Sequence, residues 1–447
     1  MRHWGIAVAA VLGIALPMYA HTQLESSEPA ADSVVDVGPA ELRLTFNERV
    51  DPDLSEVRLL VDGAAEQMLE GVKQGSAPVE LIVPVPAGVP AGEWSVKWRV
   101  AGADGHPVSG TYAFRVEAQR PVPAEAEPLP EPSSQAAAVE DEEPITVSSP
   151  AYVAARWITF AAMLTVIGAV AFRYLVLHPA RMRAPALAGA MDVAAMGAAR
   201  LGRGAALFLF LAAAVRLLLQ LETMGGADPE LLRNLLFAST WGIAWFLQGA
   251  TALLALLGFH LVVMTLASGW TVAAVAALGI ALASSLSSHA AASDLATLGV
   301  TADALHTLAV SGWLGTLLVM AGVGIPAVLR EDPRSGRFSA TSALVSAFSP
   351  RALIMAAVAA LTGTFGALLH IPTVASLWQT SYGQMLLVKL ALVAAAAGLG
   401  AWNWRRMKPR LDEGEPPERL RRSAAAELFV GVLVLLATAI LVALPTP

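Results

Sequence analysis

The residues of this chain that could bind a metal are histidines, carboxylates and methionines, because its 447 residues include no cysteine. Thiolate metal sites, disulfides and cysteine nucleophiles are therefore excluded. Asp104-Gly105-His106 places a carboxylate and an imidazole two residues apart, and His21 follows a plausible cleavage site at Ala20. In extended backbone, residues 104 and 106 point to the same side. An α-amine, two imidazoles and one carboxylate form a nitrogen-rich set that suits Cu(II).

The α-amine of His21 is available as a metal ligand only if the residues before it are removed. Arg2 and His3 provide a basic start, residues 5–16 an apolar core, and residues 17–20 a cleavage region. The apolar run is short for a membrane-spanning helix, so we expect a signal peptide over residues 1–20, with a retained anchor as the alternative. A free N-terminal histidine could then chelate one ion through its α-amine, which gives up its proton more readily than a lysine amine.

Residues 21–118 have the period-two hydrophobic pattern of strands with one buried face. Turn-forming pairs such as Asp51-Pro52 and Asp62-Gly63 separate these strands. We therefore expect a compact antiparallel sandwich or barrel. The alternating positions are Leu42, Leu44, Phe46; Val57, Leu59, Val61; Val79, Leu81, Val83; Trp94, Val96, Trp98, Val100; and Tyr112, Phe114, Val116.

Residues 119–149 are rich in proline and acidic side chains and have little apolar surface. Such a segment stays extended and solvated, because burial cannot offset the entropy of ordering it. We expect a tether between the β domain and the remainder of the chain.

The segment 150–447 contains apolar runs long enough to cross a bilayer. With 56% hydrophobic and 15% charged residues, the chain departs from the roughly 25% charged residues of soluble domains. We predict an eight-helix transmembrane bundle in a lipid bilayer, with spans at about 151–174, 204–222, 240–267, 270–287, 302–329, 352–371, 383–403 and 424–444. A net charge of −7 argues against a nucleic-acid partner. The long segments carry no P-loop, so no nucleotide is expected.

Arginine and lysine concentrate in the loops after the odd-numbered spans, and the opposite loops are nearly free of them apart from Arg233. The positive-inside rule then agrees with export of the β domain. We expect a multi-pass protein of the bacterial plasma (inner) membrane, with residues 21–149 and the C-terminus outside the cytoplasm. The basic residues are Arg173, Arg181, Arg183, Arg200, Arg203; Arg330, Arg334, Arg337, Arg351; and Arg405, Arg406, Lys408, Arg410, Arg419, Arg421, Arg422.

Three membrane histidines, His289, His306 and His370, fall near the predicted outer face, with His306 at the start of its span. Asp303 and His306 are three residues apart and share a helical face. These four residues form a candidate copper path, although an interfacial histidine bonded to a loop is the alternative for each. Cu(I) is the second candidate form there, because thioethers are available from Met224, Met264, Met320 and Met385.

Arg216, Lys389 and Glu427 also fall within or near spans, where ionisable groups usually face a polar interior. Snorkelling of the two basic residues is the alternative. For Glu427, a position at the cytoplasmic interface is the alternative.

Three stretches of the β domain look like a CopC copper-binding domain: 21–30 (HTQLESSEPA), 41–50 (ELRLTFNERV) and 98–114 (WRVAGADGHPVSGTYAF). The resemblance implies a Greek-key β-barrel that binds Cu(II) through His21, Asp104 and His106. Known members also hold Cu(I) in a methionine-rich loop, whereas this domain has only Met68. We therefore expect a Cu(II) site without a Cu(I) site.

Residues 150–447 resemble a CopD-type copper-transport domain through short motifs. The order of domains resembles known fusions linked to copper uptake, so we expect Cu(II) capture outside and transfer inward, without enzymatic activity. Resistance or sequestration without import, a membrane haem protein and a histidine-brace oxidative enzyme remain alternatives. The sequence leaves the oligomeric state open. The motifs are Ser288-His289-Ala290, Asp303-Ala304-Leu305-His306, Trp313-Leu314-Gly315, Ser381-Tyr382-Gly383 with Lys389, and 421–427 (RRSAAAE).

Overall fold

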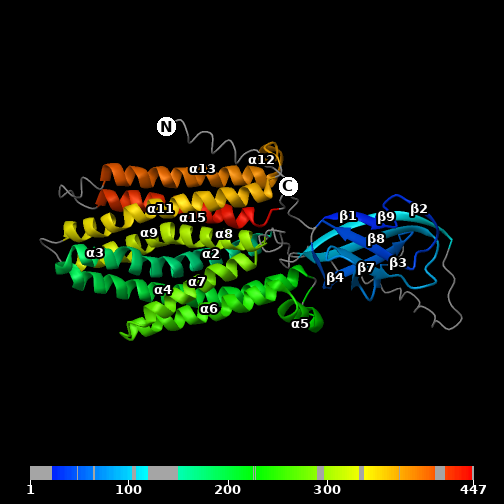
Figure 1. Ribbon diagram of the computed structural model, residues 1–447, viewed down its shortest axis with the longest axis horizontal. Coiled ribbons are helices and arrows are strands. Elements are labelled where there is room, and N and C mark those ends of the chain that lie inside the picture. The colour runs from blue at the N-terminus through cyan, green and yellow to red at the C-terminus, as the bar shows by residue number, and fades with distance from the viewer. Residues whose placement is uncertain are drawn as a thin grey trace.

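The computed structural model describes residues 23–47, 49–63, 66–102, 107–118, 149–224, 226, 228–288, 296–331, 337–371, 373–407 and 418–444. An N-terminal β-sandwich adjoins one end of a helical domain (Figure 1). The sandwich follows from the period-two hydrophobic pattern and the helical domain from the long continuous apolar runs in the sequence.

The sandwich consists of two sheets, which confirms the predicted fold. Its strands pair antiparallel except for β2 with β9, which run parallel. The first sheet has the order β1 (Leu24–Glu28), β3 (Glu41–Phe46), β7 (Glu80–Pro84), β6 (Lys73–Gln74). The second has the order β2 (Val34–Val37), β9 (Pro107–Ala118), β8 (Gly92–Gly102), β4 (Val50–Val61), β5 (Gln67–Leu69).

Alternate side chains of these strands form the core between the sheets. Leu42 and Leu44 of β3 and Leu81 of β7 are fully buried, and Trp94 of β8 lies against Phe114. The intervening residues face solvent, as a period of two requires.

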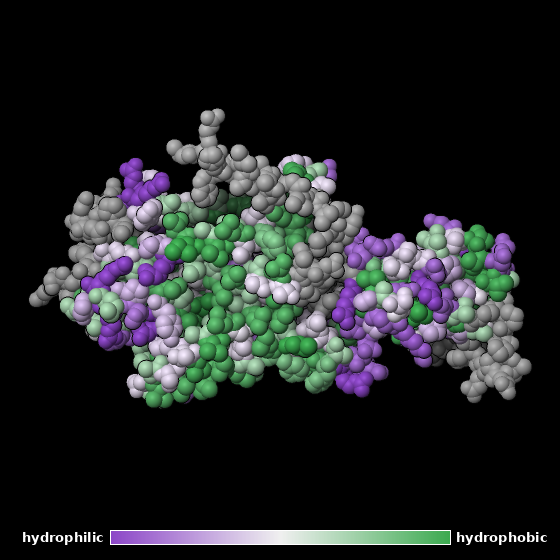
Figure 2. Space-filling view, in the orientation of Figure 1, coloured by the Kyte–Doolittle hydropathy of each residue, from purple (hydrophilic) through white to green (hydrophobic). Residues whose placement is uncertain are grey.

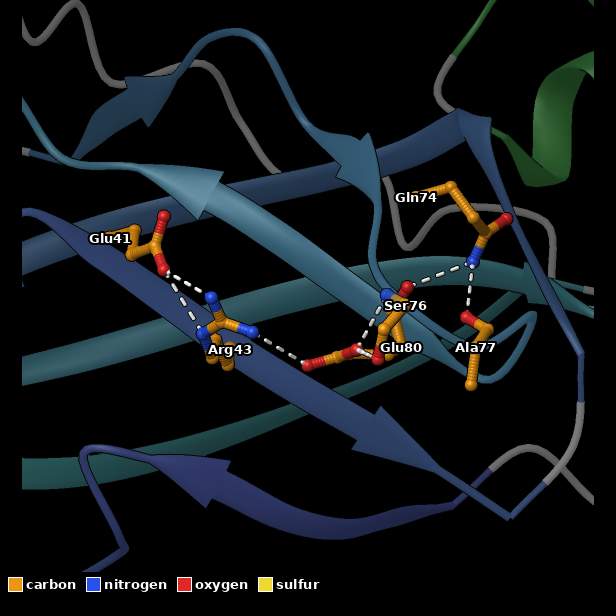
Figure 3. A network of polar contacts seen from close by, with 6 residues as sticks. All are labelled: Glu41, Arg43, Gln74, Ser76, Ala77 and Glu80. Atoms are coloured by element: carbon orange, nitrogen blue, oxygen red, sulfur yellow. Dashed lines mark hydrogen bonds and ion pairs between the residues drawn. The ribbon is translucent and has the colours of Figure 1, made fainter.

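A polar network crosses the outer side of the first sheet (Figure 3). Arg43 of β3 bonds Glu41 at 2.7 Å and Glu80 of β7 at 3.2 Å. The Ser76 hydroxyl and backbone N–H both donate to Glu80. These bonds, ahead of Arg43, lower the pKa of Glu80, so its carboxylate stays charged where it holds the two strands in register.

Eight helices of the described chain are long and apolar enough to cross a membrane. Several include short π-helical turns (η1, η4, η5 and η6), and the second begins with a 3-10 turn (η2). They are α2 (Pro150–Ala171) with η1 (Phe172–Leu177) and α3 (His178–Arg183); η2 (Pro185–Leu187) with α4 (Ala188–Thr223); α6 (Thr240–Val263); α7 (Gly269–Leu286); α8 (Ala296–Val310) with η4 (Ser311–Gly315), α9 (Thr316–Val319), η5 (Met320–Gly324) and α10 (Ile325–Glu331); α11 (Arg337–His370); α13 (Ser381–Trp402) with η6 (Asn403–Met407); and α15 (Glu418–Leu441).

The surface of these helices is apolar between a hydrophilic end and the sandwich (Figure 2). Large side chains such as Phe208, Ile243 and Leu361 are more than 60% exposed. Helices that present such side chains outward suit a lipid environment.

Four helices begin at least six residues earlier than predicted, among them α15, which begins at Glu418 instead of 424. α4 begins at Ala188 instead of 204 and α11 at Arg337 instead of 352, because their first turns mix alanine with polar residues and lack a hydropathy signal. α8 begins at Ala296, so His306 lies ten residues into the helix and not at its start. Two short helices, α5 (Pro229–Phe237) and α12 (Ser376–Gln379), were not predicted.

Two glycines allow the first and fifth spans to touch. A Cβ added to Gly168 would lie 2.3 Å from the backbone carbon of Gly315. We predict that Gly168→Ala forces these helices apart and costs about 1–3 kcal/mol, as overpacking does. Thermal unfolding of the purified protein in detergent should show a lower Tm. Gly204→Ala is the control, since nothing lies within 4 Å of its added Cβ. Equal Tm values for the two variants would contradict the prediction.

Candidate metal sites

The predicted Cu(II) ligands His21, Asp104 and His106 lie outside the described residues, but the residues that flank them are described. Gln23 is tied to the end of β3, because its N–H donates to Asn47 Oδ1 at 2.7 Å and its carbonyl accepts from the Asn47 N–H at 3.0 Å. At the other segment, Gly102 pairs with Val50, the first residue of β4. Both chain segments therefore meet the sandwich at the connection between β3 and β4.

The same end of the sandwich carries acidic and aromatic side chains. Phe46 meets Trp98 edge to face, with 5.3 Å between ring centroids, and so joins the two sheets there. Burial raises the pKa of Asp51, which pairs with Ala101 across β4 and β8. The flanking frame is thus rigid and partly polar.

A second polar cluster lies among the helices. Asp303 and His306 of α8 are half-buried. Ser288, just beyond the end of α7, donates its hydroxyl to Asp303 Oδ2 at 3.3 Å. His306 Nδ1 lies 3.0 Å from the carbonyl oxygen of Ala359 and 3.1 Å from Thr362 Oγ1, both on α11. The cluster therefore joins three spans.

These contacts define the chemistry of His306. The Ala359 carbonyl can only accept a hydrogen bond, so Nδ1 carries the proton and donates it. In a neutral imidazole, Nε2 then keeps its lone pair, as in most histidine metal ligands. A Cβ added to Gly363 would lie 3.0 Å from His306 Cε1, so this glycine provides room for the ring.

Lys389 of α13 is close enough for its charge to act on both His306 and Asp303. It is half-buried. Its positive charge is therefore part of the electrostatic surroundings of this cluster.

The structure brings together part of the predicted copper path. Asp303 and His306 share one face, and Ser288, the neighbour of His289, reaches Asp303. His289 itself lies outside the described residues. His370 is the last residue of α11, and its side chain is likewise outside the description. Within the described part of the chain, no three His, Asp or Glu side chains converge as a metal site.

The sandwich contacts the helical domain through a docking cluster of buried apolar side chains. Leu54 of β4 and Ala101 of β8 meet residues from the end of α4, from α5 and from the start of α6. Asn234 of α5 also donates to the carbonyl of Asp53 at 3.3 Å. In Figure 1, α5 lies between the helices and β4. The cluster comprises Leu54, Ala101, Leu221, Met224, Leu235 and Trp241, each no more than 5% exposed.

Sequence reasoning missed α5, although a signal was present. Asp228 accepts from the N–H groups of Glu230 and Leu231, and Pro229 occupies the first helical position. An aspartate followed by proline before an apolar-periodic run marks a helix start. No comparable pattern in the sequence indicated that Ala359 and Thr362 of α11 contact His306.

A CopC-type sandwich next to eight apolar helices defines a class of copper-handling membrane proteins, and comparison with known proteins agrees. The CopC domain model matches residues 24–117. The model of the copper resistance protein D-like N-terminal domain matches 146–300, and that of copper resistance protein D matches 342–441.

Copper transport protein CutJ of Bacillus subtilis (strain 168) is 25% identical over 459 residues, which cover 100% of this chain and 78% of the relative. Copper resistance protein C of Escherichia coli is 32% identical over 114 residues, 24% of this chain and 90% of the relative. The crystal structure of PcoC, a methionine-rich copper resistance protein from Escherichia coli, is 30% identical with a TM-score of 0.20, covering 22% of this chain and 98% of that one.

The chain belongs to the CopC family and joins its CopC domain to copper resistance protein D domains in one polypeptide. It is a multi-pass, copper-handling membrane protein. Its relatives are named as copper transport and copper resistance proteins.

Proposed function

We propose that this protein captures Cu(II) outside the cytoplasm and passes it to the membrane domain for uptake. The capture site consists of the His21 α-amine and imidazole, the Asp104 carboxylate and the His106 imidazole, after removal of residues 1–20. Residues 21–118 form the capture domain, 119–149 the tether and 150–447 the transport domain. Residues 21–149 and the C-terminus lie outside the plasma membrane in this proposal.

The docking cluster is the observation that carries the proposal. Ala101 is fully buried in that cluster, and the segment with Asp104 and His106 follows it along the chain. In Figure 1, α8 lies in the half of the helical domain that is nearer the sandwich. In this proposal, the capture residues and the acceptor residues lie toward the sandwich end of the membrane domain.

The proposed acceptor site consists of His306, Asp303, His289 and His370. The free Nε2 of His306 supports this role, as does the hydrogen bond between Asp303 and Ser288. Imidazole and carboxylate ligands suit Cu(II).

The first test is a Cu(II) titration of the full mature chain, followed by electron paramagnetic resonance. A chain that begins at His21 is compared with one that has a single alanine before His21. The extension removes the α-amine from the chelate. Because even indirect partners of a metal ligand are worth about 10–100-fold in affinity, we expect at least that loss.

Equal affinities would rule out the amine as a ligand. Direction is tested in cells: deletion of the gene should lower cell copper and growth under copper limitation. Unchanged copper content together with lost copper tolerance would support resistance or sequestration instead.

A further inference from the structure

Glu427 of α15 is a buried acid that the copper sites do not use. It is 3% exposed and lies five residues beyond Arg422, at the arginine-rich end of the helices. At a rise of 1.5 Å per residue it is about 7.5 Å inside the span. Its burial against neighbouring helices distinguishes it from a solvent-exposed carboxylate. Ionisable groups buried in a membrane domain are costly and usually functional.

Two neutral donors hold the carboxylate. Asn403 donates its Nδ2 to Glu427 Oε2 at 3.1 Å, and the Trp313 indole provides a second hydrogen bond. Gly400 leaves space for the group, since a Cβ there would lie 3.1 Å from Oε1. No ion pair to Glu427 occurs among the described side chains, so no cation fixes its charge.

The described charged side chains on the elements around Glu427 are exposed or contact other groups. On η6, Arg405 and Arg406 are exposed, as is Arg422 on α15 itself. Arg156 of α2 donates to the carbonyl of Val442 at the other end of α15. Lys389 of α13 acts on Asp303 and His306. The segments α9 and η5 of the fifth span also contact α15, and they carry no charged residue.

The second observation is an unsatisfied atom next to this carboxylate. Asn403 Oδ1 is buried and has no hydrogen-bond partner among the described residues. Such an acceptor is costly in an apolar surrounding. A protonated carboxyl group and a primary amide can form two reciprocal hydrogen bonds. A proton on Glu427 would therefore provide the donor that Asn403 lacks.

Trp313, which bonds Glu427, lies on the same span as Asp303 and His306. It lies seven residues beyond His306 on the same span, about 10.5 Å deeper at the ideal rise. It also belongs to the π-helical turn η4, a geometry frequent at functional sites. The acid and the copper cluster therefore contact the same span.

We propose that Glu427 is a proton-binding site that couples proton movement to copper passage through the membrane domain. The carboxylate takes up one proton, the new O–H donates to Asn403 Oδ1, and the proton is released again during the transport cycle. The proposal rests on the copper-transport function proposed above and assigns its energy source to a proton gradient.

The test uses the full chain in proteoliposomes, with copper uptake measured with and without a pH gradient. Wild-type uptake should change severalfold with the gradient, whereas Glu427→Gln uptake should not respond. Arg422→Gln is the matched control, because it changes an exposed charge five residues away on the same helix and should keep the response. A gradient response retained by Glu427→Gln would overturn the proposal.

An infrared pH titration tests protonation without any transport. The carbonyl stretch of a protonated buried carboxyl group should be present in the wild type and absent in Glu427→Gln. Identical spectra would also overturn the proposal. If wild-type vesicles take up copper but ignore the pH gradient, proton coupling fails while the transport function stands. If they take up no copper, the transport function fails and the infrared titration alone decides the proton site.

Discussion

Replacement of His306 by alanine should abolish copper uptake while leaving Cu(II) binding by the sandwich unchanged. The substitution removes Nε2, which has a free lone pair because Nδ1 donates to Ala359. Asp303 would then remain beside Lys389 without the imidazole. Uptake of copper by proteoliposomes measures the loss, and Cu(II) titration of the same preparation checks that the sandwich is intact.

Two glycine variants test whether the position of the His306 imidazole matters, and not only its presence. Gly363→Ala would place a Cβ 3.0 Å from His306 Cε1 and displace the ring, whereas nothing lies within 4 Å of a Cβ at Gly366 on the same helix. Uptake should fall in Gly363→Ala and persist in Gly366→Ala. Full uptake by His306→Ala would remove this residue from the copper path.

Leu54→Asp should reduce uptake strongly at low copper concentration and much less at saturating copper. A buried leucine contributes roughly 1.5–3 kcal/mol, and a charge in the docking cluster adds a desolvation cost. At about 1.4 kcal/mol per factor of ten, docking weakens at least about tenfold. The tether still keeps the donor near its acceptor, so abundant copper compensates in part. Uptake measured against copper concentration shows the shift.

Val37→Asp is the control for this change. Val37 is 49% exposed on β2, so the same charge is introduced without loss of a buried contact. Both variants should bind Cu(II) as the wild type does, because neither residue belongs to the sandwich core. Equal uptake curves for Leu54→Asp and Val37→Asp would show that the docking cluster does not contribute to transfer.

The long strands could be predicted because burial of one face leaves a period-two hydrophobic pattern. The eight spans could be predicted because helices surrounded by lipid and by other helices are apolar along a continuous run. Short edge strands such as β2 could not, since Val34 and Val37 are exposed and follow no alternation. The Asp303–His306 pair was predictable from its spacing of three. Its partners were not, because Ala359 lies 53 residues further along the chain and only helix packing brings it to His306.

The environment of Glu427 could not be predicted from the sequence either. Its distance from the end of the span suggests an interface, but the packing of α13 places Gly400 and Asn403 over the carboxylate. Burial here depends on a neighbouring helix and not on the position of the residue within its own span.

The docking cluster also has a consequence for how the two halves recognise each other. Its contacts are noncovalent and involve neither the tether nor residues next to it. We therefore expect the surface formed by α5 and the ends of α4 and α6 to bind the sandwich without help from the tether. A sandwich supplied as a separate chain could occupy it in trans, so covalent fusion adds local concentration to a recognition surface that the membrane domain already possesses.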